Sequence, residues 1–188
     1  MTGHKTLDTL FAETSLEGKR VLVRADLNVP IGPDGKVSDA TRLERLLPTL
    51  RDLAAKGAKV AILSHFDRPK GERRPEMSLK PVADALAELA GIPVAFADDC
   101  IGEAAASAMN ALANGGLLVL ENTRFHKGEE KNDKGFAEAL AANGDIYVND
   151  AFSTAHRAHS STEAIAHLLP AYAGRAMEQE LDALSKAL

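Results

Sequence analysis

Short apolar runs alternate along the chain with longer segments in which apolar residues recur every three or four positions. The short runs are continuous in Val, Ile and Leu instead of alternating with polar residues. Such runs are typical of strands that are buried on both faces of a parallel sheet. The pattern therefore predicts strands at residues 20–26, 58–64, 93–97, 117–121 and 145–150.

Helical periodicity fills the segments between these runs. In residues 39–56 five leucines follow an i, i+3, i+4 spacing, which predicts one apolar helix face. Pro48 lies inside this pattern and predicts either a kink or the start of a second half. Three further helices are expected. The first spans residues 78–90, with Ser78 as its cap and Gly91 at its end. The other two span residues 102–113 and 133–142, and each is followed by an Asn-Gly turn.

The order strand, helix, strand recurs at a regular spacing and indicates parallel βαβ units with right-handed crossovers. With 188 residues the chain is long enough for one domain with a sizeable core, or for one domain and a tail. The fold class expected is therefore α/β, with a parallel sheet at the centre and helices on both faces.

Composition excludes several classes of partner. The chain is 45% hydrophobic and 26% charged, and its net charge of −5 argues against nucleic acid or an anionic membrane as main partner. Cys100 is the single cysteine, so no disulfide framework and no cysteine zinc site is expected. No apolar run approaches the length of a membrane span, and the N-terminus lacks the apolar core of a secretory signal. We expect a cytoplasmic protein.

Arginine and histidine residues gather where the predicted strands end. Because ligands of open parallel sheets bind beyond the carboxyl ends of the strands, these residues are expected to share one edge. Guanidinium groups suit the bidentate recognition of phosphate or carboxylate, so the cluster predicts a small ligand with several negative charges. The polar residues at the strand ends are Arg24, Asp26, Asn28, His65, Arg68, Arg124, His126, His156 and Arg157, joined by Arg42 at the start of the first helix.

Each of these residues also has a plainer interpretation. A single Arg after a strand is more often a solvated surface residue, and Asp26 is more often a partner for Arg24 than a ligand contact. His156 and His159 form too weak a pattern for a metal site, and Asp98–Cys100 is better read as a polar turn, so no metal is predicted. The glycine-rich nucleotide motifs G-x-G-x-x-G and G-x-x-x-x-G-K-[ST] do not occur.

Four longer segments carry a resemblance to a known family. In chain order they are VLVRADLNVP, SHFDRPKG, LENTRFHKGEE and VNDAFSTAHRAHSS. Together they resemble the N-terminal half of the phosphoglycerate kinases, from about Lys19 to the last residue. The resemblance implies a Rossmann-like three-layer domain that binds 3-phosphoglycerate, or 1,3-bisphosphoglycerate in the reverse direction.

The resemblance also implies the roles of individual residues. It places the 3-phosphate on His65, Arg68, Arg124 and Arg157, with SHFDRPKG as the phosphate-binding loop. The full set of substrate contacts that it implies is Asp26, Leu27, Asn28, Arg42, His65, Phe66, Asp67, Arg68, Arg124 and Arg157.

The reaction implied is in-line phosphoryl transfer between the substrate carboxylate and a nucleotide, and it needs no general base because a carboxylate is already a nucleophile. Arg42, with Asp26 and Asn28, would lie near the reacting carboxyl end. Arg42 is the candidate catalytic residue, since its charge could stabilise the transferring phosphoryl group.

The chain departs from the family pattern in two ways. Asp67 and Ser153 stand where the family most often has glycine, and Asp67 would add a negative charge beside the phosphate. The chain is also short. We expect residues 1–174 to form the substrate-binding domain and residues 175–188 to begin an interdomain helix, with the C-terminal nucleotide-binding domain absent.

Mg-ATP or Mg-ADP is therefore expected on that missing C-terminal domain, which would be the partner of this chain, and no cofactor is expected here. The chain alone should be a monomer that binds 3-phosphoglycerate without turnover.

Two other classes of function stay open from the residues alone. One is a binding module for a small phosphorylated organic acid, without chemistry. The other is a scaffold whose Arg cluster pairs with internal carboxylates. Kinase activity regained with a nucleotide domain would exclude the first, and a phosphoglycerate-dependent rise in melting temperature would argue against the second.

Overall fold

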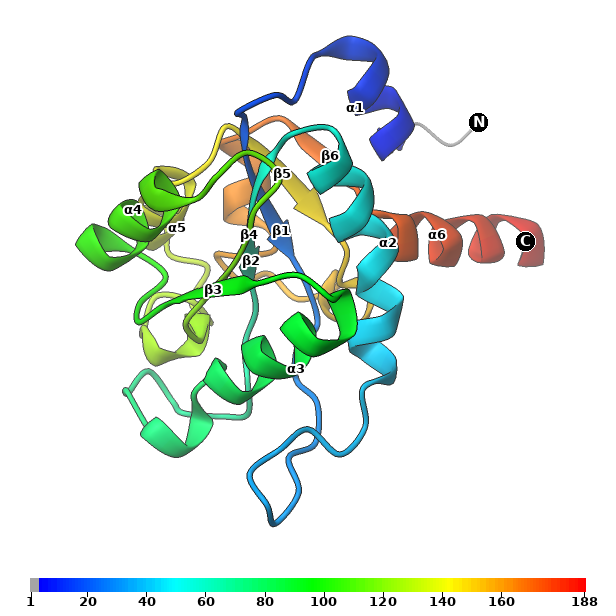
Figure 1. The fold of residues 1–188 in the computed structure, drawn as a ribbon. Coiled ribbons are helices and arrows are strands. Elements are labelled where there is room, and N and C mark those ends of the chain that lie inside the picture. Colours follow the sequence, from blue (N-terminus) through cyan, green and yellow to red (C-terminus); the bar gives the residue numbers. More distant parts are fainter. Residues whose placement is uncertain (1–3) are drawn as a thin grey trace.

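The computed structural model describes residues 4–188, and its centre is one six-stranded sheet. All neighbouring strands pair in parallel, in the order β3-β4-β2-β1-β5-β6 (Figure 1). The expected α/β class with a parallel sheet is therefore confirmed. The strands are β1 Arg20–Arg24, β2 Lys59–Leu63, β3 Val94–Ala97, β4 Leu117–Leu120, β5 Ile146–Asn149 and β6 Ala171–Ala173.

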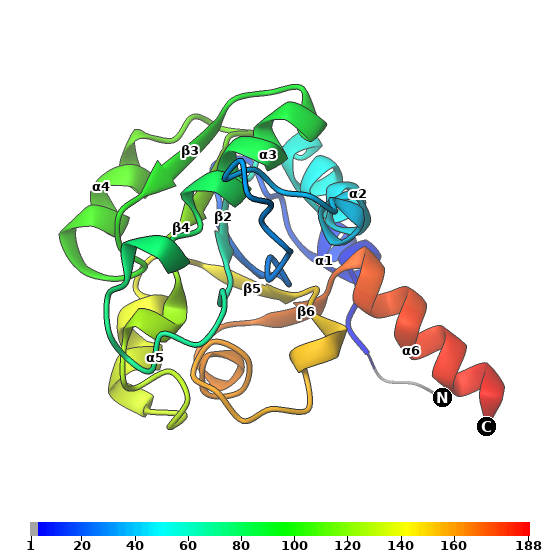
Figure 2. The ribbon, with the colours of Figure 1, turned by 90° about the horizontal axis from the view of Figure 1, so that it is seen from below.

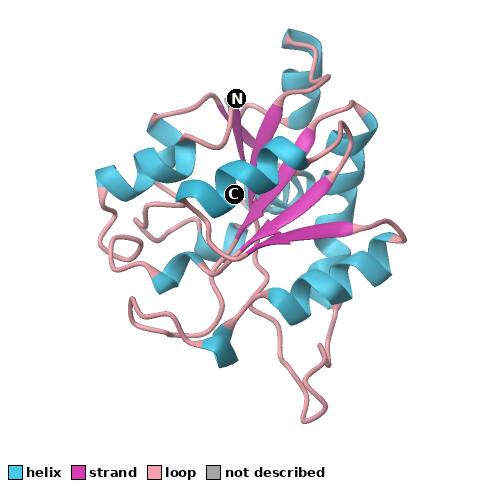
Figure 3. Cartoon of the chain, turned by 60° about the vertical axis from the view of Figure 1, so that its left-hand side comes forward, coloured by secondary structure: helices cyan, strands magenta, loops and turns pink. Residues whose placement is uncertain are grey.

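Helices cover both faces of the sheet, as Figure 3 shows. Successive residues of β1 belong to two different hydrophobic clusters, one on each face of the sheet. Val21 and Val23 are in the cluster with α1, α2 and α3. Leu22 is in the cluster with α4 and α5. Because each face is buried, the strands read as continuous apolar runs. The helices are α1 Leu7–Glu13, α2 Thr41–Ala55, α3 Lys80–Ala90, α4 Gly102–Ala111, α5 Lys134–Ala141 and α6 Arg175–Ala187.

One α-helix and one strand lie outside the sequence prediction. Helix α1 is only seven residues long and begins at a capping box in which the side chains of Thr6 and Thr9 bond each other's backbone. Strand β6 is three residues long and pairs with β5 at the sheet edge, too short to leave a periodic pattern. Both elements take their stability from the body of the domain, because segments this short are not stable alone.

Pro48 does not divide the first predicted helix. Helix α2 runs without interruption from Thr41 to Ala55 and contains Pro48 on an exposed position. A proline in a helix removes one backbone hydrogen bond, here the one to the carbonyl of Glu44. Glu44 is also exposed, so water can satisfy that carbonyl. The leucines of the predicted face are buried.

Helix α6 begins at Arg175, which ties it to the rest of the chain. The Arg175 backbone amide donates to Thr49 Oγ1 at 2.8 Å, and its guanidinium pairs with Asp52 and Asp8 at 2.9 Å each. Met177 is buried, but Leu184 is 50% exposed. Figure 2 shows the later turns of α6 extending away from the body. Among residues 4–188, no helix has the length and apolar character needed to cross a membrane.

Candidate functional site

A cavity of about 230 Å³ opens at the carboxyl ends of β1, β2, β4 and β5. Strands β1 and β5 are neighbours, yet the chain leaves them toward opposite edges of the sheet, to β2 and to β6. Such a point is where open α/β sheets bind ligands. The residues that line the cavity are Asp26, Asn28, Arg42, His65, Asp67, Arg68, Arg124, Ser153, Thr154 and Arg157.

Eight of the ten residues implied by the resemblance line this cavity, and Leu27 and Phe66 do not. Leu27 is fully buried and Phe66 is 8% exposed, both in the hydrophobic core. Their backbone amides are already engaged, by Ser64 Oγ at 3.0 Å and by Asn122 Oδ1 at 3.2 Å. These two residues therefore hold the loops in place, and their side chains face away from the cavity.

Arg124 brings a nearly buried guanidinium to the cavity wall. Its NH1 donates to the Asp67 carbonyl at 3.2 Å, and its Nε lies 3.9 Å from Glu130. Within the part of the chain that the structure describes, Nε is buried without a hydrogen-bond partner. Burial lowers the pKa of Arg124, and the Glu130 carboxylate opposes this change. Arg124 nevertheless lines the cavity, so its positive charge is close to any anion bound there.

Asn122 holds the Arg124 turn against the loop that follows β2. Its Oδ1 accepts from the amides of Phe66 and Arg124, at 3.2 and 3.0 Å. Its Nδ2 donates to the carbonyls of Phe66 and Met77, at 2.6 and 3.1 Å. Sequence reasoning did not single out this residue. The available signal was an Asn directly before a turn, where its side chain can bond the backbone two residues on.

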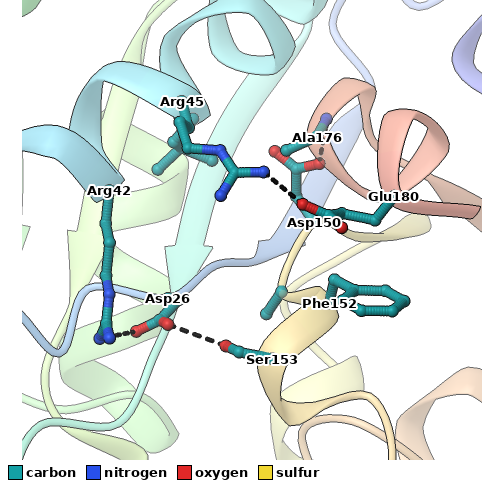
Figure 4. A pocket seen from close by; sticks show the side chains of 10 residues that line it. Asp26, Arg42, Arg45, Asp150, Phe152, Ser153, Ala176 and Glu180 are labelled. Atoms are coloured by element: carbon teal, nitrogen blue, oxygen red, sulfur yellow. Dashed lines mark hydrogen bonds and ion pairs between the residues drawn. The ribbon is translucent and has the colours of Figure 1, made fainter. Parts of the chain in front are cut away.

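Arg42 and Asp26 form an ion pair at the entrance. Arg42 NH1 lies 3.3 Å from Asp26 Oδ1 and donates to the Asn28 carbonyl at 2.7 Å. Ser153 Oγ donates to the other oxygen of Asp26 at 2.8 Å and so joins the β5 and β1 loops (Figure 4). The plainer alternative, an ion pair of Asp26 with Arg24, does not form, because the Arg24 guanidinium turns inward and bonds other groups.

His65 is an uncharged member of the cluster. Burial and then the positive charges of Arg24, Arg124 and Arg157 lower its pKa to about 2. The side chain is 4% exposed, and its Nδ1 lies 3.0 Å from NH2 of Arg24. At neutral pH His65 therefore offers a hydrogen-bond donor but no charge to a ligand.

Asp67 has an unusual backbone conformation, with φ at 58°. Its carboxylate accepts from the amide of Arg68 at 3.0 Å, and its own amide donates to Asn28 Oδ1 at 3.0 Å. Asp tolerates the left-handed region better than most residues because its short side chain can bond the local backbone. The carboxylate is exposed at the cavity edge, so its charge still faces an incoming anion.

The scaffold alternative accounts for only part of the cluster. Arg42 and Arg124 have carboxylates within 4.0 Å, but Arg68 and Arg157 have none among the described residues. Both are exposed and line the cavity. The cavity is thus lined by Arg68 and Arg157, unpaired among the described residues, by the nearly buried Arg124 and by the neutral imidazole of His65.

A second cavity of about 280 Å³ adjoins the first and is shown in Figure 4. Asp150 lies in its wall, and its Oδ1 accepts from the amides of Ala176 and Met177 at 3.0 and 3.1 Å. Burial raises the pKa of Asp150 to about 6. Gly174 fits here because a side chain would collide with the Asp150 carboxylate. These contacts fix the start of α6 to the end of β5.

Within residues 4–188, one group of side chains has the composition of a metal site: Asp99, Cys100 and His126, with ligand atoms within 4.8 Å of one another. Asp99 Oδ1 already accepts from the Cys100 amide at 2.7 Å and bonds His126 Nε2 at 2.7 Å. His126 also stacks on Phe136. These bonds favour the polar-turn interpretation of this segment. His156 and His159, whose spacing is also compatible with a metal site, both lie outside this group.

Comparison with known proteins gives a consistent result. The family model described as phosphoglycerate kinase matches residues 11–188. A phosphoglycerate kinase of Methylorubrum extorquens is 62% identical over all 188 residues, which cover 46% of the relative. One from Rhizobium meliloti is 64% identical over 184 residues, 98% of this chain and 45% of the relative.

Solved structures agree with the sequence relatives. The phosphoglycerate kinase of Coxiella burnetii superposes with a TM-score of 0.84 at 39% identity, over 94% of this chain and 44% of that one. The chain thus spans about half the length of the relatives it matches. With its fold, its strand-end motifs and these matches taken together, the chain belongs to the phosphoglycerate kinase family.

Proposed function

We propose that the cavity beyond β1, β2, β4 and β5 binds 3-phosphoglycerate, or 1,3-bisphosphoglycerate in the opposite direction. The observation that carries the proposal is the convergence of Arg68, Arg124, Arg157 and His65 on one cavity of an otherwise acidic chain. Arg68 and Arg157 have no internal ion pair among the described residues, so their charge is available to a phosphate.

We assign the lining residues to the two ends of this ligand. His65, Arg68, Arg124 and Arg157 would hold the 3-phosphate. Asp26, Asn28 and Arg42 would then lie toward the carboxyl end, where the phosphoryl group is gained or lost.

Arg42 is the proposed catalytic residue. It occupies the first turn of α2, and its side chain is 53% exposed at the entrance, where a second ligand could approach. Its guanidinium is oriented by Asp26 and by the Asn28 carbonyl. Charge on a transferring phosphoryl group is redistributed in the transition state, and a fixed guanidinium at that point lowers the barrier.

Phosphoryl transfer itself is proposed for a full-length protein that carries this segment. The nucleotide, as Mg-ATP or Mg-ADP, would be the second substrate and would bind to a C-terminal domain like the part of the relatives beyond the matched half. Residues 1–174 would be the substrate-binding domain, and residues from 175 onward would lead into an interdomain helix. The chain alone is proposed to be a monomeric, cytoplasmic binding unit without turnover.

The proposal is tested by the melting temperature of the chain with and without 3-phosphoglycerate. At about 100 times the dissociation constant, the ligand should stabilise the fold by roughly 2.7 kcal/mol. For a chain of this size the melting temperature should rise by roughly 5–10 °C. Mg-ATP at the same concentration is the control and should cause no comparable rise. No shift at millimolar 3-phosphoglycerate would refute the proposal.

A further inference from the structure

A fully buried guanidinium lies beneath His65. Arg24, the last residue of β1, has no exposed surface. Its Nε donates to Ser161 Oγ at 2.8 Å, its NH1 donates to the Ala25 carbonyl, and its NH2 lies 3.0 Å from His65 Nδ1. All three nitrogens are thus bonded inside the protein. Arg24 does not line the cavity and cannot be a direct ligand contact there.

The charge of Arg24 is balanced through a serine. Ser161 Oγ lies 2.6 Å from Glu129 Oε2, and the Ser161 amide donates to Glu129 Oε1 at 2.8 Å. Because a guanidinium can only donate, the Ser161 hydroxyl accepts from Arg24 and gives its own hydrogen to Glu129. Glu129 is also fully buried, and the Tyr147 hydroxyl fixes the Ser161 carbonyl at 2.8 Å. Arg24 is therefore held in one orientation.

This orientation of Arg24 determines which ring nitrogen of His65 carries the hydrogen. Arg24 NH2 has no lone pair to offer, so the nitrogen that faces it, His65 Nδ1, must accept. A neutral imidazole that accepts at Nδ1 carries its hydrogen on Nε2. Within the described residues Nε2 has no hydrogen-bond partner, and His65 lines the cavity.

We propose that Arg24 is a positioning residue of the anion site: it fixes His65 in the Nε2–H tautomer, while Ser161 and Glu129 fix Arg24. The ligand in this statement rests on the proposed function, but the tautomer does not. Without this arrangement the imidazole could turn or present a bare nitrogen, which would repel a phosphate oxygen.

The surroundings also keep His65 from gaining a charge. Burial, first, and then four basic groups lower the pKa of His65: Arg24 from β1, Arg124 from the turn after β4, and Arg157 and His159 from the segment after β5. The carboxylates of Asp26 and Asp67 line the same cavity, but they do not reverse this direction. His65 should thus remain a neutral donor across the range from pH 5.5 to 8.

Nitrogen NMR of the histidine rings tests the tautomer without any ligand. In the wild-type chain His65 should show one pyrrole-type Nε2 and one pyridine-type Nδ1, unchanged between pH 5.5 and 8. A hydrogen on Nδ1, or a titration near 6.5, would overturn the inference. A separate calorimetric titration with 3-phosphoglycerate reports on the proposed function, so either can fail while the other holds.

Variants of Arg24 test the positioning role. Arg24→Met alone would leave Glu129 as an unpaired buried charge and could unfold the chain. We therefore compare wild type with the double variant Arg24→Met/Glu129→Gln, which removes both buried charges together. The double variant should lose the single-tautomer signature and bind at least about tenfold more weakly.

Arg20→Met is the matched control, because Arg20 lies at the opposite end of the same strand and pairs with Asp145 at 3.0 Å. It should change neither the His65 signature nor the affinity. A folded double variant with the wild-type signature and affinity would refute the positioning role of Arg24.

Discussion

The side chain of Asn122 and the backbone of Phe66 exchange two hydrogen bonds, one at 3.2 Å into Asn122 Oδ1 and one at 2.6 Å from Asn122 Nδ2. Phe66 follows β2, and Asn122 follows β4. Since Asn122 also accepts from the Arg124 amide, the loops that carry His65 and Arg124 form one bonded unit. The cavity wall is thus built before a ligand arrives.

Asn122→Ala should break this unit. The substitution leaves the buried amide and carbonyl of Phe66 without their Asn122 partners. We therefore expect the free energy of unfolding to fall by about 2–4 kcal/mol. The affinity for 3-phosphoglycerate should fall at least about tenfold. Denaturant unfolding and calorimetry measure the two effects. Asn114→Ala is the control and should change little, because Asn114 is exposed and its side chain donates to Glu17 at the surface.

Asp67 should weaken anion binding through its charge. Asp67→Asn keeps an oxygen for the Arg68 amide and suits the positive φ, so it removes the charge alone. We expect 3-phosphoglycerate to bind up to about fivefold more tightly, roughly 1 kcal/mol, to both Asp67→Asn and Asp67→Gly.

Asp34→Asn is the control, since Asp34 also accepts from a nearby backbone amide, that of Lys36, and does not line the cavity. Equal or weaker binding by Asp67→Asn would show that the Asp67 carboxylate helps the site.

Asp150 makes stability depend on pH. Its pKa rises from the usual 3.8 to about 6 on folding, so the folded chain binds a proton more tightly than the unfolded chain. Protonated Asp150 therefore adds to the free energy of unfolding. This stabilisation is fully present below about pH 4 and is lost as the pH rises through 6. The change corresponds to roughly 3 kcal/mol, because each pH unit is worth about 1.36 kcal/mol.

Asp150→Asn should remove this dependence, because an amide oxygen can still accept from Ala176 and Met177 without a buried charge. We expect the variant to be more stable than wild type at pH 7.5 and to show a flatter profile between pH 4 and 7. Urea unfolding across this range is the measurement. A variant less stable than wild type at pH 7.5 would show that the two amides require the carboxylate charge.

Arg42 and Arg68 should separate chemistry from binding. In a full-length relative such as that of Methylorubrum extorquens, the Arg42→Ala equivalent should lower kcat by roughly 10²- to 10³-fold. The Arg68→Ala equivalent should mainly raise KM, because the 3-phosphate does not change during the reaction. Arg42→Lys should restore little, since an ammonium lacks the planar fork. Intact turnover in Arg42→Ala would remove its catalytic role.

The sequence predicted the features that depend on local pattern. Continuous apolar runs predicted five of the six strands, and the arginines at their ends predicted the edge of the sheet at which the cavity lies. Pro48 does not interrupt helix α2, because packing of the leucine face outweighs the loss of one backbone hydrogen bond. Strand β6 was not predicted, because a strand of three residues is too short to show a recognisable hydrophobic pattern.

The supporting contacts could not be predicted in the same way. Arg24 and Asp26 are two residues apart in a strand exit, yet the structure turns Arg24 toward Ser161, which is 137 residues away in the chain. Asn122 and Glu129 look like ordinary polar residues until the loops that they bond are brought together. Such partners are set by the packing of distant segments, and no local pattern records them.

Calorimetric titration of this chain with 3-phosphoglycerate tests the central claim most directly. The account predicts one saturable site, with affinity that falls as salt rises and that is weakened at least about tenfold in Arg124→Ala or Arg157→Ala. Arg51→Ala, on the exposed face of α2 away from the cavity, should bind as wild type does. Absence of binding at millimolar ligand, or equal binding by Arg124→Ala, Arg157→Ala and Arg51→Ala, would contradict the account.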